Sequence, residues 1–584
     1  MYIMFNFSNF GRQLPALLLC VFSLSAGASS FRVQCPISTA LHPLVSPSAA
    51  NPTGANPDIK CQQLSGGDGF ATMGDGTQTY LFAFGPLSGM ADIVHGLPGT
   101  QPASQFNVDS SIHLNDLYIG APAPNPAVAL SPGTDYTFNG AVGIVPDFSM
   151  DPWASATYYA VNSNVRNSAG NIYVATVAGN SGITEPTVTS GTVIDGGVTW
   201  AYQSSALTGH VDPRTIMDVG VLNGSAPAPL MAIDEDDEFF LTLTNVGMVM
   251  RPDLFEQHTV HFHGYPNASA FFDGVPDASV AINIGGSFTY YYLAPDAGTY
   301  FWHCHITPPE HLQMGMVGQL FVRPRQNRVI GNLRDALAAL NAPPASTSNP
   351  TAAEYENLRK RCDGDILCSN PLPPVNYASN DGTKKYAYND GDGSTAYDVE
   401  YPIQMHGFDP NFHFVGMTFN PEAFVDLKDK YFLLNGRSYP DTIHDGPMKT
   451  QSPDGIERMS QPMSAIINIP AGGKALLRFS DLNVTEFHTL ASLGIPMHVI
   501  GVNAKLLRDQ DGNNMAYDTN SITLGGGESL DVILDATTGY SAGQKFYLYT
   551  PQLDHLSNDA ENFGGMMTEI NICNSVDPKT KQCT

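Results

Sequence analysis

Positively charged residues are scarce in this sequence. The 584 residues include 27 lysines and arginines against 55 aspartates and glutamates, which gives a formal net charge of −28. A surface of this sign stays soluble and repels nucleic acid and anionic membranes, so we expect no nucleic-acid partner. The ordinary interpretation of such a charge is a solvated acidic face, and attraction of cationic partners or metal ions is the alternative.

Long apolar runs are lacking beyond the first 28 residues. Residues 1–28 are typical of a secretory signal peptide, because Arg12 is their only charge, residues 14–24 are apolar, and Ala26-Gly-Ala28 is a small-residue cleavage site. A retained membrane anchor is the alternative, but the apolar run is short for a full span. The sequence therefore predicts a secreted protein, periplasmic or extracellular, with no membrane span.

Cysteine is also infrequent, with eight residues in the chain. Cys20 falls in the predicted signal peptide, and Cys304 falls in a histidine-rich segment described below. The other six form near neighbours in the sequence: Cys35 with Cys61, Cys362 with Cys368, and Cys573 with Cys583. An even remainder in an exported chain predicts three disulfide bonds. Because six cysteines allow many connectivities, pairing by proximity is a hypothesis.

Segments with helical periodicity are few. Lysine is sparse, whereas the chain has 55 glycines and 43 prolines together with frequent serine and threonine. This composition favours an all-β fold class, with turns between short strands. The length leaves room for several domains.

Two short segments contain six of the sixteen histidines. The first is His258-Thr-Val-His261-Phe-His263-Gly264; the second, about forty residues later, is Trp302-His303-Cys304-His305, which continues to His311 and Met316. Successive side chains of a strand point to opposite faces, so the two histidines of each His-x-His pair share one face. Cys304 points to the other face, into the sheet sandwich.

These residue types indicate copper. One thiolate, two imidazoles and a weak thioether form the trigonal site that favours blue (type 1) copper, and this set is supplied by Cys304, His258, His311 and Met316. The outward-facing imidazoles can hold further copper, joined to the thiolate through the peptide that they share. A structural zinc site is disfavoured, because the set is rich in imidazole and has a single thiolate. Paired clusters that flank a cysteine also argue against unrelated core or surface histidines.

The motifs resemble those of the multicopper oxidase family. The segment 258–264 is similar to the first copper motif of that family, and Phe272-Asp-Gly-Val-Pro276 is similar to the segment that follows it. Residues 285–290 and 297–300 resemble the strand that leads into the second histidine pair. The resemblance covers about residues 230–324. It implies cupredoxin-like Greek-key β-sandwich domains, type 2 copper at His261, and type 3 copper at His263, His303 and His305.

The sequence departs from the family in two respects. The second type 1 histidine usually lies five residues after the cysteine, whereas His311 lies seven after Cys304; copper nitrite reductases have a longer gap still. A complete trinuclear cluster needs four His-x-His pairs, and this chain has two. Three explanations stay open: a neighbouring chain supplies ligands, two copies of this domain meet face to face in a homo-oligomer, or no trinuclear cluster forms.

The resemblance also gives a domain organisation. After the signal peptide (1–28) we predict an N-terminal arm (29–76), a copper-binding cupredoxin domain (77–325), a linker (326–399) and a second cupredoxin-like domain (400–584). The linker has short helical stretches at 329–340 and 351–361. The last domain resembles the middle domain of three-domain oxidases, on motifs such as Leu434-Asn-Gly-Arg-Ser-Tyr-Pro440, and is expected to lack type 1 copper.

Residues 153–203 are predicted to be a small β module inserted into the copper-binding domain. Their order of aromatic residues, from Trp153 through Tyr158 and Tyr173 to Trp200, resembles chitin-binding-type carbohydrate modules and related phage-type modules. Aromatic faces suit sugar rings, but such residues also fill the core of so small a domain. A structural insert is the first interpretation, and polysaccharide binding is the second.

Several histidines lie outside the two clusters. His95 and His113 are single and are expected to be ordinary polar residues. The second half contains six more, none in a His-x-His pair: His406, His413, His444, His488, His498 and His555. Of these, His488, His498 and His555 are the best candidates to complete a copper site. Met566 and Met567 are expected to pack in a core.

Two functions from different classes follow. The first is an exported copper oxidoreductase, in which Cys304 and His311 are the catalytic residues that take electrons from a small molecule or metal ion, and dioxygen is the acceptor. The second is a blue-copper electron-transfer or copper-binding protein with an incomplete trinuclear site. A nitrite-reductase-like enzyme is a variant, with one type 2 copper on His263 and His303. It is disfavoured because His261 stands where that family has a catalytic aspartate.

Overall fold

The computed structural model describes residues 34–107, 153–169, 171–204, 220–265, 270–294, 296–328, 330–333, 378–418 and 424–584. Strands dominate these residues, which confirms the all-β fold class. The signal peptide, residues 334–340 and 351–361 of the predicted helical stretches, His113, Cys362 and Cys368 lie outside the described residues. Residues 330–333 are described, and the prediction of a helix is wrong at Gly331–Asn332, which form a short strand paired with Ser379–Asn380. Two predicted disulfides lie within them and are formed, Cys35–Cys61 and Cys573–Cys583. Among the described helices, none is long and apolar enough to cross a bilayer.

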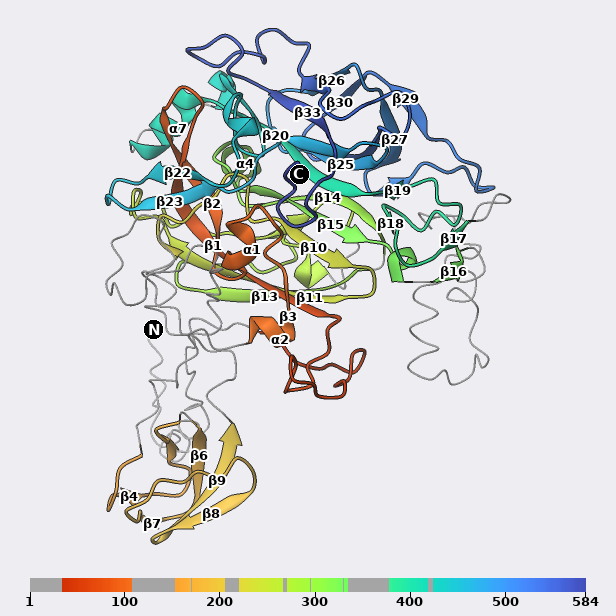
Figure 1. Ribbon diagram of the computed structural model, residues 1–584. Helices are drawn as coiled ribbons and strands as arrows, with labels where there is room; N and C mark the ends of the chain where they lie inside the picture. The colour runs from red at the N-terminus through yellow and green to blue at the C-terminus, as the bar shows by residue number, and fades with distance from the viewer. Residues whose placement is uncertain are drawn as a thin grey trace, which may run out of the picture. The chain divides into compact units, whose positions relative to one another are not determined.

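Two β sandwiches make up the larger of two compact units (Figure 1). One sheet of the first sandwich has the order β13 (Ser287–Leu293), β11 (Glu238–Gly247), β1 (Ile59–Thr72), β2 (Gln78–Pro86), with β3 (Gln101–Pro102) paired to β1. The other has the order β10 (Met231–Asp234), β15 (Val317–Arg323), β14 (Gly298–His303), β12 (His261–Phe262). Apolar side chains from both sheets form one core, which includes Phe82, Leu241, Tyr290, Trp302 and Leu320.

The second sandwich is built the same way. Its first sheet runs β21 (Tyr431–Leu434), β20 (Val399–Phe408), β25 (Lys474–Asp481), β31 (Ser529–Asp535), β27 (Met497–Val502), β28 (Lys505–Leu506), with β29 (Tyr517–Thr519) paired to β27. Its second sheet runs β24 (Ile467–Pro470), β33 (Met567–Cys573), β32 (Lys545–Tyr549), β26 (His488–Leu493), β30 (Ser521–Leu524). In both sandwiches a long early strand pairs in parallel with a strand from much later in the chain. These pairs are β1 with β11 and β20 with β25.

Short elements connect these sheets. The helices are α1 (Met90–Ile93), α2 (Ala103–Phe106), α4 (Pro308–Gln313) and α7 (Pro410–Met417). Single 3-10 turns occur at η3 (Ala270–Phe272), η4 (Arg325–Arg328), η5 (Phe424–Asp426) and η6 (Asp441–Ile443). Two-stranded ribbons are β16 (Gly331–Asn332) with β17 (Ser379–Asn380), β18 (Lys385–Tyr386) with β19 (Ala396–Tyr397), and β22 (Met448–Gln451) with β23 (Glu457–Gln461).

The strand β1 lies within the range that the sequence predicted as an N-terminal arm. Its sequence, Ile-Lys-Cys-Gln-Gln-Leu-Ser-Gly-Gly-Asp-Gly-Phe-Ala-Thr, has no alternation of apolar and polar residues, yet nearly all of it is buried. Gln63 and Asp68 are paired by hydrogen bonds inside the protein, Gln63 through Thr244 and Asp68 through the N–H of Met250. A central strand that buries polar side chains shows no alternation of apolar and polar residues. The sequence alone therefore could not predict this strand.

Buried charges join the two sandwiches. The Arg478 guanidinium, on β25, donates to Glu400 at 3.1 Å and lies 3.5 Å from Asp531, and Arg323 of the first sandwich donates to Glu400 at 2.7 Å. From β14, Thr299 donates its hydroxyl to Asp531 at 2.6 Å. Since buried charges are costly unless they are paired, this network holds the sandwiches in one arrangement.

The inserted residues form a small unit of their own. It contains a sheet of β5 (Asn164–Arg166), β6 (Ile172–Val177), β9 (Val198–Ser204) and β8 (Thr192–Asp195), and a ribbon of β4 (Tyr158–Tyr159) with β7 (Gly179–Asn180). The indole N–H groups of Trp153 and Trp200 both donate to the Asp195 carboxylate, at 2.8 and 3.0 Å. Both tryptophans thus support the module, and Tyr158, 66% exposed, is the aromatic residue left at its surface. Polysaccharide binding through 153–203 stays a prediction.

Candidate metal centre

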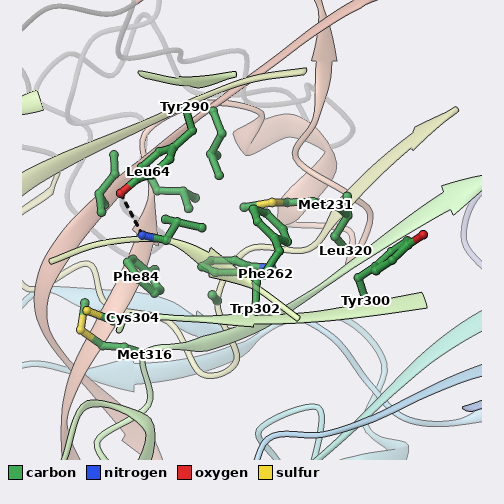
Figure 2. Close-up of a cluster of buried hydrophobic side chains, with 14 of the residues drawn as sticks. Leu64, Phe84, Met231, Phe262, Tyr290, Tyr300, Trp302, Cys304, Met316 and Leu320 are labelled. Atoms are coloured by element: carbon green, nitrogen blue, oxygen red, sulfur yellow. Dashed lines mark hydrogen bonds between the residues drawn. The ribbon is translucent and has the colours of Figure 1, made fainter. Parts of the chain in front are cut away.

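Three strands and one helix converge on Cys304. The strand β14 ends at His303, and the next residue, Cys304, donates its backbone N–H to the carbonyl of Met316 at 3.1 Å, just before β15 begins. Between them, α4 turns the chain back and carries His311. His258 enters from the loop before β12, where it forms a two-way backbone bridge with Ile282. The Tyr290 hydroxyl accepts the N–H of Val260, which ties this loop to β13 (Figure 2).

The first group of ligand atoms surrounds the Cys304 sulfur. The Nδ1 of His311 lies 3.2 Å from it and the Nδ1 of His258 lies 4.0 Å from it. All three residues are fully buried, and so is Met316, whose side chain extends from the same end of the core as that of Cys304 (Figure 2). The structure therefore brings together the four residues that the sequence grouped. We call this set the Cys304 pocket.

Space for the pocket is provided by β1. Gly66 faces His258, and a Cβ atom at this position would lie 2.8 Å from the His258 Cδ2. On the far side, the His311 Nε2 lies 3.5 Å from the Glu256 carboxylate, which is partly exposed. A histidine that ligates a metal commonly gives its other ring nitrogen to such a carboxylate, which sets the tautomer and the ring orientation.

Charges in the Cys304 pocket favour the thiolate. Burial would raise the pKa of the Cys304 thiol, but the neighbouring His311 and His258 outweigh it and lower that pKa well below the usual value. Burial likewise would lower the pKa of His311, but the thiolate and Glu256 raise it to about 10. A thiolate is the form of cysteine that binds metal, so the protein stabilises the ligand form before metal arrives.

A second group of nitrogen atoms lies beyond the Cys304 peptide. Ligand atoms of His261, His263 and His303 lie within 4.8 Å of one another, and the Nε2 atoms of His263 and His303 are 3.0 Å apart. The ring of His305 lies 5.0 Å from that of His261, centroid to centroid, and 5.4 Å from that of His303. The four predicted outer histidines therefore cluster, with three in ligand range and His305 beside them. We call this set the outer cluster.

Backbone carbonyl groups orient the outer cluster. The Nδ1 of His261 donates to the carbonyl of Asp273 at 2.7 Å, and the Nδ1 of His303 donates to that of Cys304 at 2.7 Å. His263 hydrogen-bonds the backbone of Gly527, in the loop between β30 and β31. The Nε2 atoms of His263 and His303 face each other at 3.0 Å, and the bond that the His303 Nδ1 donates leaves the His303 Nε2 as an acceptor. A proton or a cation between the two nitrogen atoms stabilises this arrangement.

Burial favours the neutral form of three outer imidazoles, those of His261, His263 and His303. It lowers the pKa of His263 to about 4, with a further contribution from His261, and it lowers that of His303 well below the usual value. Burial also lowers the pKa of His261. A metal ligand must be a neutral imidazole, so the cluster is ready to bind a cation without first losing protons.

Five further histidines of the described residues are engaged elsewhere. His42 pairs with Glu238 at 2.8 Å, His95 contacts the carbonyl of Ala91, and His498 pairs with Asp518 at 2.8 Å. His406 contacts the carbonyl of Leu312, and His413 contacts those of Tyr80 and Gln313. Within the described ranges, no further histidine joins the outer cluster. Of His488, His498 and His555, the candidates for completing a copper site, none lies in the outer cluster, and His498 pairs with Asp518 instead.

Sequence reasoning missed the residues that orient the ligands. Glu256 precedes His258 by two positions, and Asp273 and Gly527 act through backbone groups, which no residue type reveals. Glu256 carried one usable signal, namely a carboxylate two residues before a predicted ligand. Gly527 carried another, because it belongs to a run of three glycines, and a Cβ atom there would lie 2.7 Å from the His263 Nδ1.

Comparisons with known proteins agree with this geometry. A family model described as multicopper oxidase matches residues 206–327, which include the Cys304 pocket and the outer cluster. Residues 206–327 belong to the multicopper oxidase family. "Multicopper oxidase MCE" of Talaromyces pinophilus is 33% identical over 166 residues, which are 26% of this chain and 26% of that protein. "Laccase abr2" of Aspergillus fumigatus is 29% identical over 166 residues, 26% of this chain and 27% of that protein.

A copper-containing nitrite reductase of Rhizobium meliloti is 34% identical over 114 residues, which cover 19% of this chain and 27% of that protein. The chain thus spans about a quarter of the length of these curated relatives. Copper is the cofactor of the multicopper oxidase domain. The residues present fit it: a buried thiolate with two Nδ1 atoms directed at it, and three imidazoles of the outer cluster with ligand atoms within 4.8 Å of one another.

Proposed function

We propose that this protein is a copper-dependent oxidoreductase of the multicopper oxidase type, which oxidises a small reductant or metal ion by single electrons and passes them to dioxygen. One observation carries the proposal. Cys304 belongs to the Cys304 pocket and its neighbour His303 belongs to the outer cluster, so one peptide links two sets of metal ligands. A protein that only carries electrons has no need of the second set.

The first role of the chain is to bind and orient two kinds of copper site. In the proposed assignment, His258, Cys304, His311 and Met316 hold type 1 copper, and the outer histidines hold type 2 and type 3 copper. Bound copper supplies the one-electron redox chemistry and the coordination of dioxygen. The carbonyl groups that accept from His261 and His303 keep the Nε2 atoms aimed inward, which lowers the reorganisation needed when charge moves.

The second role is to connect the sites. Two short routes lead from the Cys304 sulfur to the outer cluster: the covalent chain through the backbone to either flanking histidine, and the 2.7 Å hydrogen bond from the His303 Nδ1 to the Cys304 carbonyl. Because a complete reduction of dioxygen to water takes four electrons and four protons, four one-electron oxidations of donor must be collected per dioxygen.

The third role is to receive the donor. His311 is fully buried, and its Nε2 contacts Glu256, whose side chain is 23% exposed. Glu256 is therefore the link between the Cys304 pocket and solvent. A carboxylate at that point, on a chain with a net charge of −28, favours cationic reductants, and metal ions such as Cu(I), Fe(II) or Mn(II) fit it better than anionic ones.

The outer cluster supports a homo-oligomer in the active form. Only one half of a family-type trinuclear set lies among the described residues, and His261 and His263 remain partly exposed. A second copy that meets this face would add the same histidines, as in the face-to-face arrangement predicted from the sequence. Export to the periplasm or the extracellular space stays part of the same proposal.

A second candidate function is that of a blue-copper electron carrier. The observation that favours it is the same half set of outer histidines, since dioxygen reduction in this family uses the full set. In this case the Cys304 pocket would exchange electrons with a partner, and the outer cluster would hold at most a single copper.

Dioxygen consumption separates the two. We would measure it on the full-length, copper-loaded protein with a one-electron reductant, for the wild type, His303→Gln, and the exposed control His444→Gln. If the protein is an oxidase, the wild type consumes dioxygen. His303→Gln should abolish this consumption while the blue absorption remains, and His444→Gln should leave the consumption unchanged. A wild type whose blue colour is bleached by the donor and returns only with an added protein oxidant, without dioxygen consumption, would establish the electron carrier.

A further inference from the structure

The second sandwich repeats the frame of the Cys304 pocket, residue for residue. In the first sandwich the strand register pairs His261 with His303 and His303 with Val317. In the second it pairs Ala491 with Tyr549 and Tyr549 with Met567. Superposing these registers gives each ligand of the Cys304 pocket a counterpart: His488 for His258, Thr550 for Cys304 and Met566 for Met316.

Backbone hydrogen bonds confirm the correspondence. The Cys304 N–H donates to the Met316 carbonyl at 3.1 Å, and the Thr550 N–H donates to the Met566 carbonyl at 3.0 Å. The Met316 N–H donates to the His311 carbonyl at 2.8 Å, and the Met566 N–H donates to the His555 carbonyl at 3.0 Å. His555 is therefore the counterpart of His311, although the loop that carries it has a different length.

The side chains of this second pocket are buried and close together. His488, Thr550 and Met566 are 0% exposed and His555 is 1% exposed. The His488 and His555 rings are 5.5 Å apart, against 5.4 Å for His258 and His311. Even the outer carboxylate is repeated: Glu486, two residues before His488, contacts the His555 Nε2 at 2.7 Å, as Glu256 contacts the His311 Nε2.

Two imidazole nitrogens in this pocket have no hydrogen-bond partner. They are the Nδ1 atoms of His488 and His555, the same atoms that face sulfur in the Cys304 pocket. The Asp481 Oδ1 lies 3.3 Å from the His488 Nδ1, and the Asp481 Oδ2 is buried without a partner. Buried polar atoms without partners are rare, so several in one pocket indicate a missing ligand.

We propose that His488, His555 and Met566 form a second metal site, which binds Cu(I) without a thiolate. Two imidazoles and a thioether are soft, uncharged donors of the kind that suits Cu(I). Met405, also fully buried, stands at the strand position of Gly66 and so adds a thioether on the side of the pocket where the first sandwich has no side chain.

The charge of the second pocket is arranged differently from that of the Cys304 pocket. The Cys304 pocket has its negative charge on the thiolate, whereas Thr550 is neutral. The position of Asn245 in the first sandwich is taken by Asp481 in the second, as the matching bonds to Gly286 and Glu528 show. Asp481 thus places a buried carboxylate beside the pocket, in addition to the partly exposed Glu486, and a buried cation is costly unless such a group pairs with it. The site does not depend on oxidase activity.

Copper content under reducing conditions tests the site. Full-length wild type, His488→Gln/His555→Gln and the control His498→Gln would be loaded anaerobically with Cu(I) and then exposed to a chelator that removes loosely bound copper. We expect about one copper per chain less in the double variant and no change in His498→Gln. Equal copper in all three would overturn the proposal. Blue absorption in the double variant, after oxidation, shows that the first sandwich is intact.

A gain-of-signal variant keeps the proposal testable if the double variant does not fold. In a Cys304→Ser background, Thr550→Cys supplies the missing thiolate, and the copper-loaded protein should show the intense visible absorption of a copper–thiolate bond. Thr550→Ser in the same background should not. Folded, copper-loaded Thr550→Cys protein without this absorption would show that the four positions do not converge on one ion, and the site would be wrong.

Discussion

In the first sandwich Cys304 stands between His303 and His305, whereas in the second sandwich Thr550 stands between Tyr549 and Pro551. The two chains of backbone hydrogen bonds around these residues are the same, and so are the buried histidines and the methionine next to them. The outer face differs completely, since Ala491 and Leu493 take the places of His261 and His263. The frame of a copper pocket is thus a property of the sandwich, and the chemistry depends on a few side chains.

This difference also explains why the outer cluster is only half formed among the described residues. The second sandwich approaches it through the Gly527 loop, and not through the strands that would carry equivalent histidines. In the proposed face-to-face arrangement, ligands for the other half come from another copy of the first sandwich. Proximity of two similar domains within one chain is not enough to complete a shared site, because each must present the correct face.

The largest effect is expected for Cys304→Ser. This variant makes the first pocket resemble the second, with two buried imidazoles and a thioether but no thiolate. The blue absorption should disappear and electron transfer to the outer cluster should stop, while the fold persists because serine is nearly the same size. Visible and electron spin resonance spectra of the copper-loaded protein check this. An unchanged visible spectrum would contradict the type 1 assignment; Thr550→Ser in the wild type is the matched control and should leave it unchanged.

The next largest effect is expected when the ion-pair network between the sandwiches is broken at Glu400. Glu400→Gln leaves Arg478, which is fully buried, with Asp531 at 3.5 Å as the remaining carboxylate of this network, and should lower the free energy of unfolding by about 3–5 kcal/mol. Burial would raise the pKa of Glu400, but Arg323 and Arg478 outweigh it and hold that pKa well below its usual value. The wild type should therefore have this contribution in full above the unfolded pKa of about 4.3 and lose it as pH falls.

Urea unfolding of the wild type and Glu400→Gln between neutral pH and about pH 3 measures both quantities. The gap between the two proteins should narrow as the pH falls, because the wild type alone has a carboxylate to protonate. A gap that stays constant with pH would mean that the charge of Glu400 does not matter. Lys449→Gln, at an exposed pair with Glu457, is a control that should change stability by less than about 1 kcal/mol.

Much of the first sandwich could be predicted from the sequence. The period of two in His-x-His and His-Cys-His places the cysteine and the histidines on opposite faces, and the structure has them there. The second pocket could not be found in this way, because its ligands are spread from His488 to His555 and no cysteine marks the centre. Sequence reasoning named His488, His498 and His555 together, and only the strand register separates the two that converge from the one at the surface.

The strand β1 shows a different limit. It buries Gln63, Ser65 and Asp68 in the centre of a sheet, so its sequence looks like a polar loop. Tertiary hydrogen bonds engage the Gln63 amide nitrogen and one Asp68 oxygen, and such partners lie far away along the chain, as Thr244 does for Gln63 and Met250 for Asp68. The alternation of apolar and polar residues therefore predicts strands with one solvent-exposed face better than strands that are buried on both faces.

A substitution in β1 sharpens the comparison between the pockets. In Gly66→Ala the new Cβ would lie 2.8 Å from a ring carbon of the buried His258, so the ring or the strand has to move. We expect a cost of about 1–3 kcal/mol in the free energy of unfolding, typical of overpacking, and a shifted blue absorption. The counterpart, Met405→Leu, conserves volume and should cost less than about 1.5 kcal/mol without a change in that absorption. Urea unfolding and visible spectra check both; an unshifted absorption in Gly66→Ala would mean that His258 is not a ligand.

The outer carboxylates allow the closest comparison, because they are the same residue in the same place. Glu256→Gln removes the charge that orients His311, and Glu486→Gln does so for His555, 3.5 and 2.7 Å away respectively. Loss of such a partner typically lowers metal affinity about 10–100-fold.

Glu256→Gln should weaken copper binding only in the Cys304 pocket. It should also slow the oxidation of cationic donors, because Glu256 is the link to solvent. Glu486→Gln should weaken only the Cu(I) of the second pocket and leave the blue absorption and donor oxidation intact. Competition with chelators of graded affinity measures each, and crossed effects, in which either variant alters the other pocket, would mean that the two sites are not separate.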